Sequence, residues 1–448
     1  MNMTYRSAAV GGILFLCATL ARAAAPPTVA ATPPMGWNSW DCYGTTVTEA
    51  EVKANADAMA AHLKQHGWQY IVVDIQWSQP NAEGFAYQPD ARLAMDAYGR
   101  LIPAVNRFPS SAGGKGFQPL ADYVHSLGLK FGIHIMRGIP RQAVKANLPV
   151  YGSKAHAADF ADVHSLCPWN PDMYGVDTTR PGGQDYYDSI VKLYASWGVD
   201  FIKADDIARP THRGEIAALH QAILKTGRPI VLSLSPGPAM VKDKEFLHEN
   251  ANMWRISDDF WDNWKALRLN FILLSIWSGV GHPGAWPDAD MLPLGRIGGR
   301  PEQGHARRTN FTPTEQQTLM SLWCIAQSPL IFGGDLPSND AATLALITND
   351  EVLAVNQKGA HGGAFAEGGD DIIWTADAVG SNAKYVAVFN VGDAKPIDIR
   401  VAWAALRMPE KCTLRDLWAH KDLGMIDGGY TFTVEPHGSG LYKLAPAR

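Results

Sequence analysis

Short apolar runs alternate with amphipathic stretches from residue 35 to residue 333 of the chain. An apolar run bounded by turn residues predicts a buried strand, whereas apolar residues repeating every three or four positions predict a helix. We expect eight strands, at or within residues 35–41, 69–74, 130–135, 198–207, 229–234, 253–257, 276–290 and 329–333. Helices are expected at residues 47–66, 120–127, 185–197 and 314–327.

This alternation of strands and helices favours an α/β fold with a parallel sheet, and eight such units favour a closed (β/α)8 TIM barrel over residues 26–345. An open doubly wound sheet is the alternative, which has less support because no G-x-G-x-x-G motif follows the first strand. Residues 346–448 instead hold short alternating segments at 385–390, 397–401 and 430–434, separated by Gly, Pro and Asp. They predict a C-terminal antiparallel β-sandwich domain.

The N-terminus has the three parts of a secretory signal peptide: Arg6, an apolar run at residues 8–20, and A-R-A-A-A at residues 21–25. We therefore expect residues 1–25 to be removed and the protein to be secreted or periplasmic. No later stretch is long and apolar enough to span a membrane, so no membrane partner is expected. Four cysteines follow the signal, which permits disulfides without requiring them: Cys42, Cys167, Cys324 and Cys412.

Composition narrows the class of function. The net charge of −5 offers no basic patch for nucleic acid, and the 14 histidines are scattered without an H-E-x-x-H motif. We expect no metal and no cofactor. The 15 tryptophans and 42 glycines suit an aromatic-lined pocket reached by tight loops, as in proteins that bind carbohydrate.

Charged residues gather where the predicted strands end, which is where a barrel of this kind carries its active residues. They are Asp74, Lys203, Asp205, Asp206, Arg255, Asp258, Asp259, Asp288 and Asp290. Carboxylates at four strand ends need a common polar ligand. Two carboxylates from different strands, without metal-site spacing, suit glycoside hydrolysis by a nucleophile and a general acid.

The stretch at 198–207, G-V-D-F-I-K-A-D-D-I, supplies the predicted nucleophile. On a strand Phe201, Lys203 and Asp205 share one face, so the lysine keeps Asp205 ionised. Asp206 has the opposite parity and is expected to support the loop. Asp259 is the predicted acid, with neighbouring Asp258 as its rival. By itself this stretch is equally compatible with a strand that runs into an Asp-rich turn.

Four motifs in this order resemble glycoside hydrolase family 27, the family of the α-galactosidases or melibiases. They are M-G-W-N-S-W (35–40), F-I-K-A-D-D (201–206), W-R-I-S-D-D (254–259) and W-P-D-A-D-M-L (286–292). The resemblance implies that Asp205 is the nucleophile and Asp259 the general acid/base. It also implies a barrel, a C-terminal β-sandwich and retention of anomeric configuration.

Three parts of the expected pocket wall depart from that family's pattern. Ile75 stands where α-galactosidases have a second aspartate after Asp74, His134 replaces a tyrosine, and Ser235-Pro236-Gly237 replaces Cys-Glu-Trp. A hydroxyl buried without its acceptor costs about 1–3 kcal/mol, so the aspartate-to-isoleucine change favours a sugar that lacks this group. β-L-Arabinopyranose is α-D-galactopyranose without the exocyclic hydroxymethyl, and the family includes β-L-arabinopyranosidases with an aliphatic residue here.

We therefore expect an exo-acting, retaining glycosidase that releases α-D-galactosyl or β-L-arabinopyranosyl residues from an oligosaccharide or polysaccharide side chain. An isomaltodextranase-like glucan hydrolase and a non-catalytic carbohydrate-binding protein are the alternatives. The oligomeric state stays open. The predicted sugar-binding residues are Trp40, Asp74, Ile75, His134, Lys203, Ser235, Arg255 and Asp290; for His134 a buried structural role explains the sequence equally well.

Overall fold

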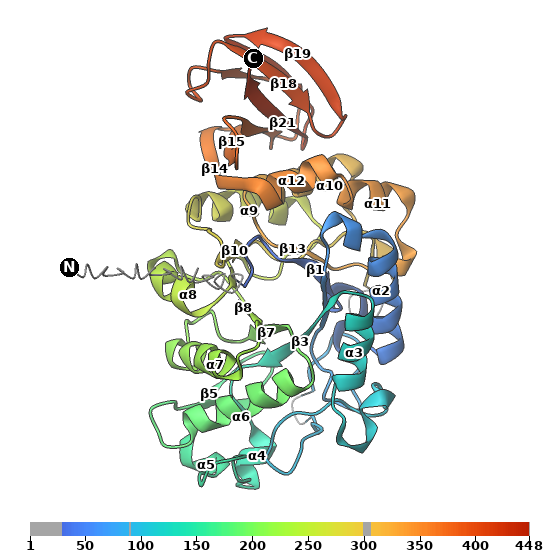
Figure 1. Ribbon diagram of the computed structural model, residues 1–448, viewed down its shortest axis with the longest axis vertical. Helices are drawn as coiled ribbons and strands as arrows, with labels where there is room; N and C mark the ends of the chain where they lie inside the picture. The colour runs from blue at the N-terminus through green and yellow to red at the C-terminus, as the bar shows by residue number, and fades with distance from the viewer. Residues whose placement is uncertain (1–28, 89–90, 299–305, 448) are drawn as a thin grey trace, which may run out of the picture.

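The computed structural model describes residues 29–88, 91–298 and 306–447 (Figure 1). The chain forms a barrel of parallel strands with a smaller antiparallel domain packed against one side of it. The predicted signal peptide at residues 1–25 lies outside the described residues. None of the helices in the described ranges is long and apolar enough to cross a membrane.

The barrel consists of eight parallel strands in the order β10-β9-β8-β7-β3-β2-β1-β13. A bridge between Leu292 and Phe332 joins the segment after β10 to β13 and closes the ring. Each strand falls at a predicted place, which confirms the barrel: β1 (Met35–Asn38), β2 (Tyr70–Val73), β3 (Lys130–Met136), β7 (Phe201–Asp205), β8 (Val231–Leu234), β9 (Met253–Arg255), β10 (Trp286–Asp288) and β13 (Leu330–Phe332).

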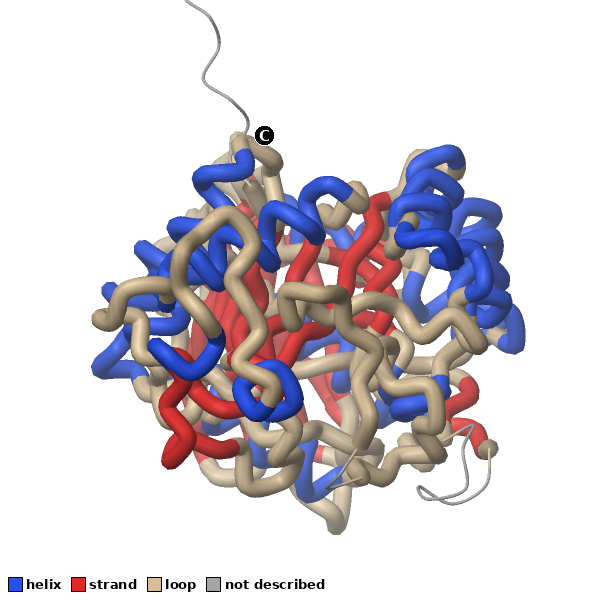
Figure 2. The backbone as a smooth tube through the Cα atoms, turned by 90° about the horizontal axis from the view of Figure 1, so that it is seen from below, coloured by secondary structure: helices blue, strands red, loops and turns tan. Residues whose placement is uncertain are grey.

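Helices surround these strands in Figure 1, and in the view from below they flank the strands on both sides (Figure 2). Thr48 and Thr312 precede two of them and form capping boxes with Glu51 and Glu315. In each box the threonine side chain accepts the N–H of the glutamate, and the glutamate side chain accepts the N–H of the threonine. The helices of the ring are α2 (Glu49–His62), α3 (Gln118–Ser126), α6 (Gly183–Ser196), α7 (Arg213–Thr226), α8 (Lys244–Asn250), α9 (Trp264–Ile276) and α10 (Pro313–Ile325), followed by α11 (Ala341–Ile347) and α12 (Asp350–Lys358).

Short elements that the apolar pattern did not predict lie in the connections between strands. Helix α1 (Trp40–Tyr43) follows β1 directly. The connection from β3 to α6 forms a small sheet with two short helices, and a later connection contributes a pair of short antiparallel strands. These elements are β4 (Ile139–Pro140), α4 (Arg141–Lys145), α5 (Ala157–Phe160), β5 (Ala161–Leu166), β6 (Met173–Val176), β11 (Arg296–Ile297) and β12 (Arg307–Arg308).

Two apolar layers hold the barrel together. Side chains of alternate residues meet inside it, among them Val72, Phe201 and Val231, while their neighbours Ile71 and Ile202 face the layer of helices. This alternation gives Lys203 and Asp205 the same orientation as Phe201. The strand therefore delivers both charged groups to the inside of the barrel at its C-terminal end.

The C-terminal domain has a sheet in the order β14-β15-β16-β21-β18-β19, faced by the pair β17-β20. Its core includes Val386, Ile399, Leu414 and Phe432 from both sheets, as in a β-sandwich. The strands are β14 (Gly359–Gly368), β15 (Asp371–Ala378), β16 (Lys384–Asn390), β17 (Ile397–Ala402), β18 (Lys411–Asp416), β19 (Lys421–Asp427), β20 (Gly429–Val434) and β21 (Ser439–Pro446).

The four cysteines Cys42, Cys167, Cys324 and Cys412 are buried with free thiols. The disulfides that the sequence permitted are thus not formed, and each thiol packs as a small apolar group.

Candidate active site

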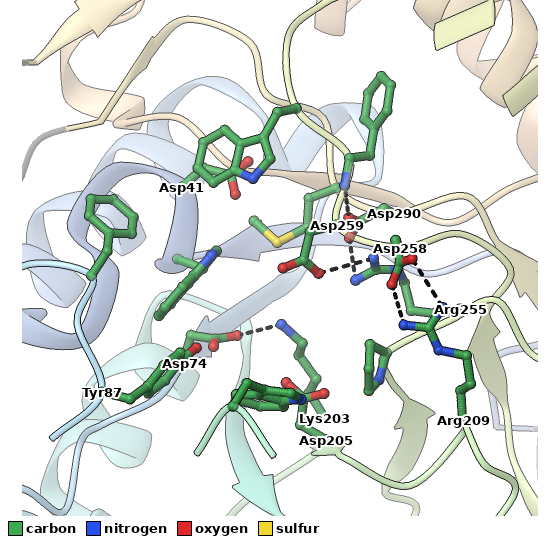
Figure 3. Close-up of a pocket in the computed structure, with 17 residues that line it drawn as sticks. Asp41, Asp74, Tyr87, Lys203, Asp205, Arg209, Arg255, Asp258, Asp259 and Asp290 are labelled. Carbon is green, nitrogen blue, oxygen red and sulfur yellow. Dashed lines mark hydrogen bonds and ion pairs between the residues drawn. The ribbon is translucent and has the colours of Figure 1, made fainter. Parts of the chain in front are cut away.

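A cavity of about 450 Å³ opens at the C-terminal ends of the barrel strands (Figure 3). Most of its polar lining comes from the strand ends, and its aromatic lining comes from helix α1 and the loops. The lining residues are Trp40, Asp41, Asp74, Phe85, Tyr87, Trp169, Lys203, Asp205, Arg209, Pro236, Arg255, Asp258, Asp259, Phe260, Trp261, Asp290 and Met291.

Asp205 ends strand β7 and lies at the enclosed part of the cavity, where its side chain is only 14% exposed. Its Oδ2 lies 3.1 Å from Nε2 of His134, and its Oδ1 accepts a hydrogen bond of 3.0 Å from the N–H of Asp206. Burial would raise the pKa of Asp205, but the hydrogen bond from His134 and the charge of Lys203 outweigh it. The pKa lies well below its usual range, so this carboxylate stays ionised.

Lys203 and Asp74 form a buried ion pair between the ends of β7 and β2. The Nζ of Lys203 lies 2.9 Å from Oδ2 of Asp74, and the two side chains are 15% and 1% exposed. Asn38 donates a second hydrogen bond of 2.6 Å to the same oxygen. Burial alone would raise the pKa of Asp74, but Lys203 lowers it below its usual value. Both groups are therefore charged and fixed in the cavity wall.

Arg255, at the end of β9, joins two further carboxylates. Its Nη1 lies 2.8 Å from Oδ1 of Asp290, and its Nη2 lies 3.3 Å from Oδ1 of Asp259. The guanidinium is buried, whereas the side chain of Asp259 is 67% exposed at the mouth of the cavity. Burial raises the pKa of Asp290 although Arg255 opposes this rise. Arg255 thus forms ion pairs with Asp259 on the solvent side and with Asp290 on the inner side of the cavity.

Asp258, the rival of Asp259 for the acid role, belongs to a different contact. Both of its carboxylate oxygens accept hydrogen bonds from Arg209, at 2.6 and 3.0 Å. Arg209 comes from the loop after β7, so this pair bridges the rim of the cavity between two loops (Figure 3). Asp258 is therefore engaged as an ion-pair partner, which leaves Asp259 as the carboxyl nearer to Arg255 and Asp290.

An aromatic wall faces the carboxylates. Trp40 stacks on Tyr87 with ring centroids 5.9 Å apart and an interplanar angle of 9°. Tyr87 in turn contacts Trp169, and Phe85 lies edge-on between Trp40 and Trp261. Flat apolar faces opposite carboxylates suit the apolar and hydroxyl-bearing surfaces that a pyranose ring presents.

Three predicted sugar-binding residues do not line this cavity. His134 is 1% exposed and lies behind Asp205, whose carboxylate it holds. Ser235 lines a smaller space inside the barrel, together with Arg255 and Asp288. Ile75 is 4% exposed and belongs to the apolar core outside the strands. Strand alternation explains why the side chain of Ile75 points away from the cavity: the side chain of the preceding residue, Asp74, points inward.

The segment after Asp74 consequently brings a single carboxylate to the cavity. Ile75 gives its backbone N–H to Asp74 Oδ1 at 2.9 Å but adds no polar side chain to the wall. Asp288, at the end of β10, accepts the N–H of Asp290, and burial raises the pKa of Asp288 to about 7.

Several lining residues were missed by reading the sequence. Phe85, Tyr87 and Trp169 lie in long connections without hydrophobic periodicity, and Trp261 and Arg209 lie in loops that follow strands. The one signal in the sequence that could have identified Asp41 as a lining residue is its position directly after Trp40, at the end of the M-G-W-N-S-W motif.

The arrangement supports one kind of chemistry. An enclosed carboxylate that stays ionised can attack an anomeric carbon, and an exposed carboxyl at the mouth can exchange protons with a leaving group or water. Lys203, Asp74, Arg255 and Asp290 can bind and orient hydroxyls between them. Among the described residues no group of three or more His, Cys, Asp or Glu side chains is placed to hold a metal ion.

Comparison with known proteins gives a consistent result. The family model described as alpha galactosidase A matches residues 32–179 and 172–358, and the model of the alpha galactosidase C-terminal beta sandwich domain matches residues 368–444. The α-galactosidase of Coffea arabica is 31% identical over 428 residues, covering 93% of this chain and 94% of that enzyme. Alpha-galactosidase 2 of Arabidopsis thaliana is 30% identical, with 93% and 90% covered.

Two solved structures are also similar. The crystal structure of a family 27 β-L-arabinopyranosidase from Geobacillus stearothermophilus has a TM-score of 0.91 and 53% sequence identity, covering 93% of this chain and 97% of that chain. α-Galactosidase I from Mortierella vinacea has a TM-score of 0.72 and 25% identity, covering 94% and 99%.

Proposed function

Since the chain belongs to the alpha galactosidase A family, glycoside hydrolase family 27, we propose that it is a retaining exo-glycosidase that prefers terminal β-L-arabinopyranosyl over α-D-galactosyl residues. The observation that carries the preference is the single carboxylate, Asp74, that the segment after β2 brings to the cavity. An acceptor for an exocyclic hydroxymethyl is absent from the described wall at this place. The 53% identity to an arabinopyranosidase supports the same preference.

The reaction proceeds in two steps. Asp205 attacks the anomeric carbon while Asp259 gives its proton to the departing glycosidic oxygen, and a glycosyl ester of Asp205 forms. Asp259 then removes a proton from water, the water oxygen attacks the anomeric carbon, and the ester bond breaks to regenerate the Asp205 carboxylate. Two inversions at the same carbon give net retention.

The positions of the two carboxyls support these roles. Asp205 is enclosed and held ionised by His134 and Lys203, which a nucleophile requires. Asp259 is 67% exposed, so it can meet both the leaving group and the incoming water. The aromatic wall of Trp40, Tyr87 and Trp169 supports an oligosaccharide or polysaccharide side chain as the natural substrate.

Comparing kcat/KM for nitrophenyl β-L-arabinopyranoside and nitrophenyl α-D-galactopyranoside tests the preference. The kcat/KM for the arabinoside should be at least tenfold higher. A higher kcat/KM for the galactoside would contradict the proposed preference. Asp259→Asn and Asp258→Asn form a matched pair, because their side chains are adjacent and equally exposed at 67%. Asp259→Asn should lose at least 100-fold in kcat/KM, whereas Asp258→Asn should stay within about fivefold.

We also propose that residues 1–25 direct export and are then removed, on the strength of their charged, apolar and small-residue segments. N-terminal sequencing of the protein recovered from the periplasm or medium tests this. A mature chain that still begins at Met1 would contradict export by this signal.

A further inference from the structure

Asp41 is a buried carboxyl in the wall of the catalytic cavity that the two-step reaction does not use. It lies in helix α1, next to Trp40, and is 3% exposed. Its Oδ2 has no hydrogen-bond partner among the described residues. Buried polar groups in proteins are nearly always paired, so this carboxyl is an exception with unused hydrogen-bonding capacity.

The other lining carboxylates are all engaged within the described part of the chain. Asp74 holds Lys203, Asp205 lies against His134, and Arg209 and Arg255 take the remaining three, which are Asp258, Asp259 and Asp290. Asp41 differs from them because it is 3% exposed and no Lys, Arg or His side chain of the described residues forms an ion pair with it. Its carboxyl therefore has hydrogen-bonding capacity that no described side chain uses.

The charges around Asp41 determine its protonation state. Burial raises the pKa of Asp41 well above its usual range, and the carboxylates of Asp290, Asp259 and Asp74 raise it further, against the opposing charge of Lys203. This shift favours the neutral form of the carboxyl, which carries an O–H. A protonated carboxyl offers one donor and one acceptor, which matches a sugar hydroxyl in both respects.

Hydrogen bonds from neighbouring segments fix the backbone at Asp41. The N–H of Gly298 donates to the carbonyl of Asp41 at 2.7 Å, and Asn38 Oδ1 accepts the N–H of Trp40 at 2.9 Å. Across from the side chain, a Cβ on Gly333 would lie 1.9 Å from Asp41 Oδ2. Glycine at position 333, just beyond β13, therefore leaves the space that the carboxyl occupies.

We propose that Asp41 is a substrate-binding residue, whose carboxyl group exchanges hydrogen bonds with a ring hydroxyl of the sugar held between Trp40 and Asp290. This inference rests on the proposed glycosidase function. It adds an uncommitted carboxyl to the site, on the wall formed by α1.

Sugar binding is measured by calorimetry in an Asp205→Asn background, which prevents turnover, with L-arabinose, D-galactose, D-glucose and isomaltose as ligands. Asp41→Ala should weaken the binding of the preferred sugar at least tenfold. Asp41→Asn keeps the shape, one donor and one acceptor, and should stay within threefold of the background. Gly333→Ala, which crowds the carboxyl, should also weaken binding and serves if Asp41→Ala does not fold.

Deoxy analogues of the preferred sugar identify the contact. In the background protein, removing a contacted hydroxyl from the sugar weakens binding. In Asp41→Ala this loss of affinity should disappear for the one hydroxyl that Asp41 contacts, while it should persist for the others. Unchanged affinity in Asp41→Ala, equal loss in Asp41→Asn, or the same penalty at every deoxy position in background and variant would overturn the inference. Absence of binding of all four sugars by the background protein would instead refute the proposed function and this inference with it.

Discussion

Replacing Lys203 by methionine tests the electrostatic design of the cavity. The change keeps the length of the side chain but removes the cation that lies 2.9 Å from Asp74. Asp74 is 1% exposed and would remain as a buried carboxylate without its main partner. Removing one member of a buried ion pair costs about 3–5 kcal/mol, and the remaining hydrogen bond from Asn38 places the expected loss near the lower end of that range.

The matched control is Lys225→Met, which breaks a surface pair with Asp188. These side chains are 53% and 29% exposed, so the loss should stay below about 1 kcal/mol. Urea unfolding at pH 7 gives both values. A double-mutant cycle with Asp74→Asn isolates the pair itself, because the asparagine removes the charge that Lys203 compensates.

Lys203→Met should also change the pH dependence of activity. Burial tends to raise the pKa of Asp205, and His134 and Lys203 hold it below its usual range. Without Lys203 this pKa rises, so the acid limb of kcat/KM should move to higher pH. A loss of stability no larger than in Lys225→Met, together with an unmoved acid limb, would refute the assignment of Lys203 as the fixed cation of the site.

Two further predictions concern groups behind the cavity. His134→Phe removes the hydrogen bond to Asp205 Oδ2, so the acid limb of kcat/KM should rise in pH while the alkaline limb stays; an unchanged profile would contradict a positioning role for His134. Asp288 has a pKa of about 7 in the folded protein against about 3.9 when unfolded, so its contribution to the free energy of unfolding falls by up to about 1.4 kcal/mol per pH unit between pH 4 and 7. Asp288→Asn should remove this pH dependence from the free energy of unfolding. Equal pH dependence in both proteins would count against the buried neutral carboxyl.

The barrel was predictable because its strands are short apolar runs that end in charged residues. The run that ends in Lys203 and Asp205 illustrates this, since strand alternation alone gave both side chains their common inward face. Alternation also explains why Ile75 does not line the cavity, although the resemblance to α-galactosidases drew attention to it. The strand ends therefore carried most of the recognisable chemistry.

Apart from Trp40, the residues of the aromatic wall could not be predicted by the same reasoning, and neither could Asp41. Tyr87 and Trp169 lie in connections whose path depends on tertiary packing and not on local periodicity. The resemblance favoured Asp259 over Asp258, but the physical difference between them, an ion pair with Arg209 for Asp258 and a contact with Arg255 for Asp259, needed the three-dimensional structure. Sequence spacing gives the candidates for a site, and only the three-dimensional contacts show which of them are already engaged.

The central claim is that Asp205 forms the covalent bond to the sugar. Incubation with a slowly hydrolysed fluorinated arabinopyranosyl fluoride, followed by proteolysis and mass spectrometry, tests it most directly. A single glycosyl adduct is expected on the peptide that contains Asp205, formed at a rate that falls when His134 or Lys203 is replaced. An adduct on Asp259, Asp258 or any other carboxylate would contradict the role of Asp205 as nucleophile.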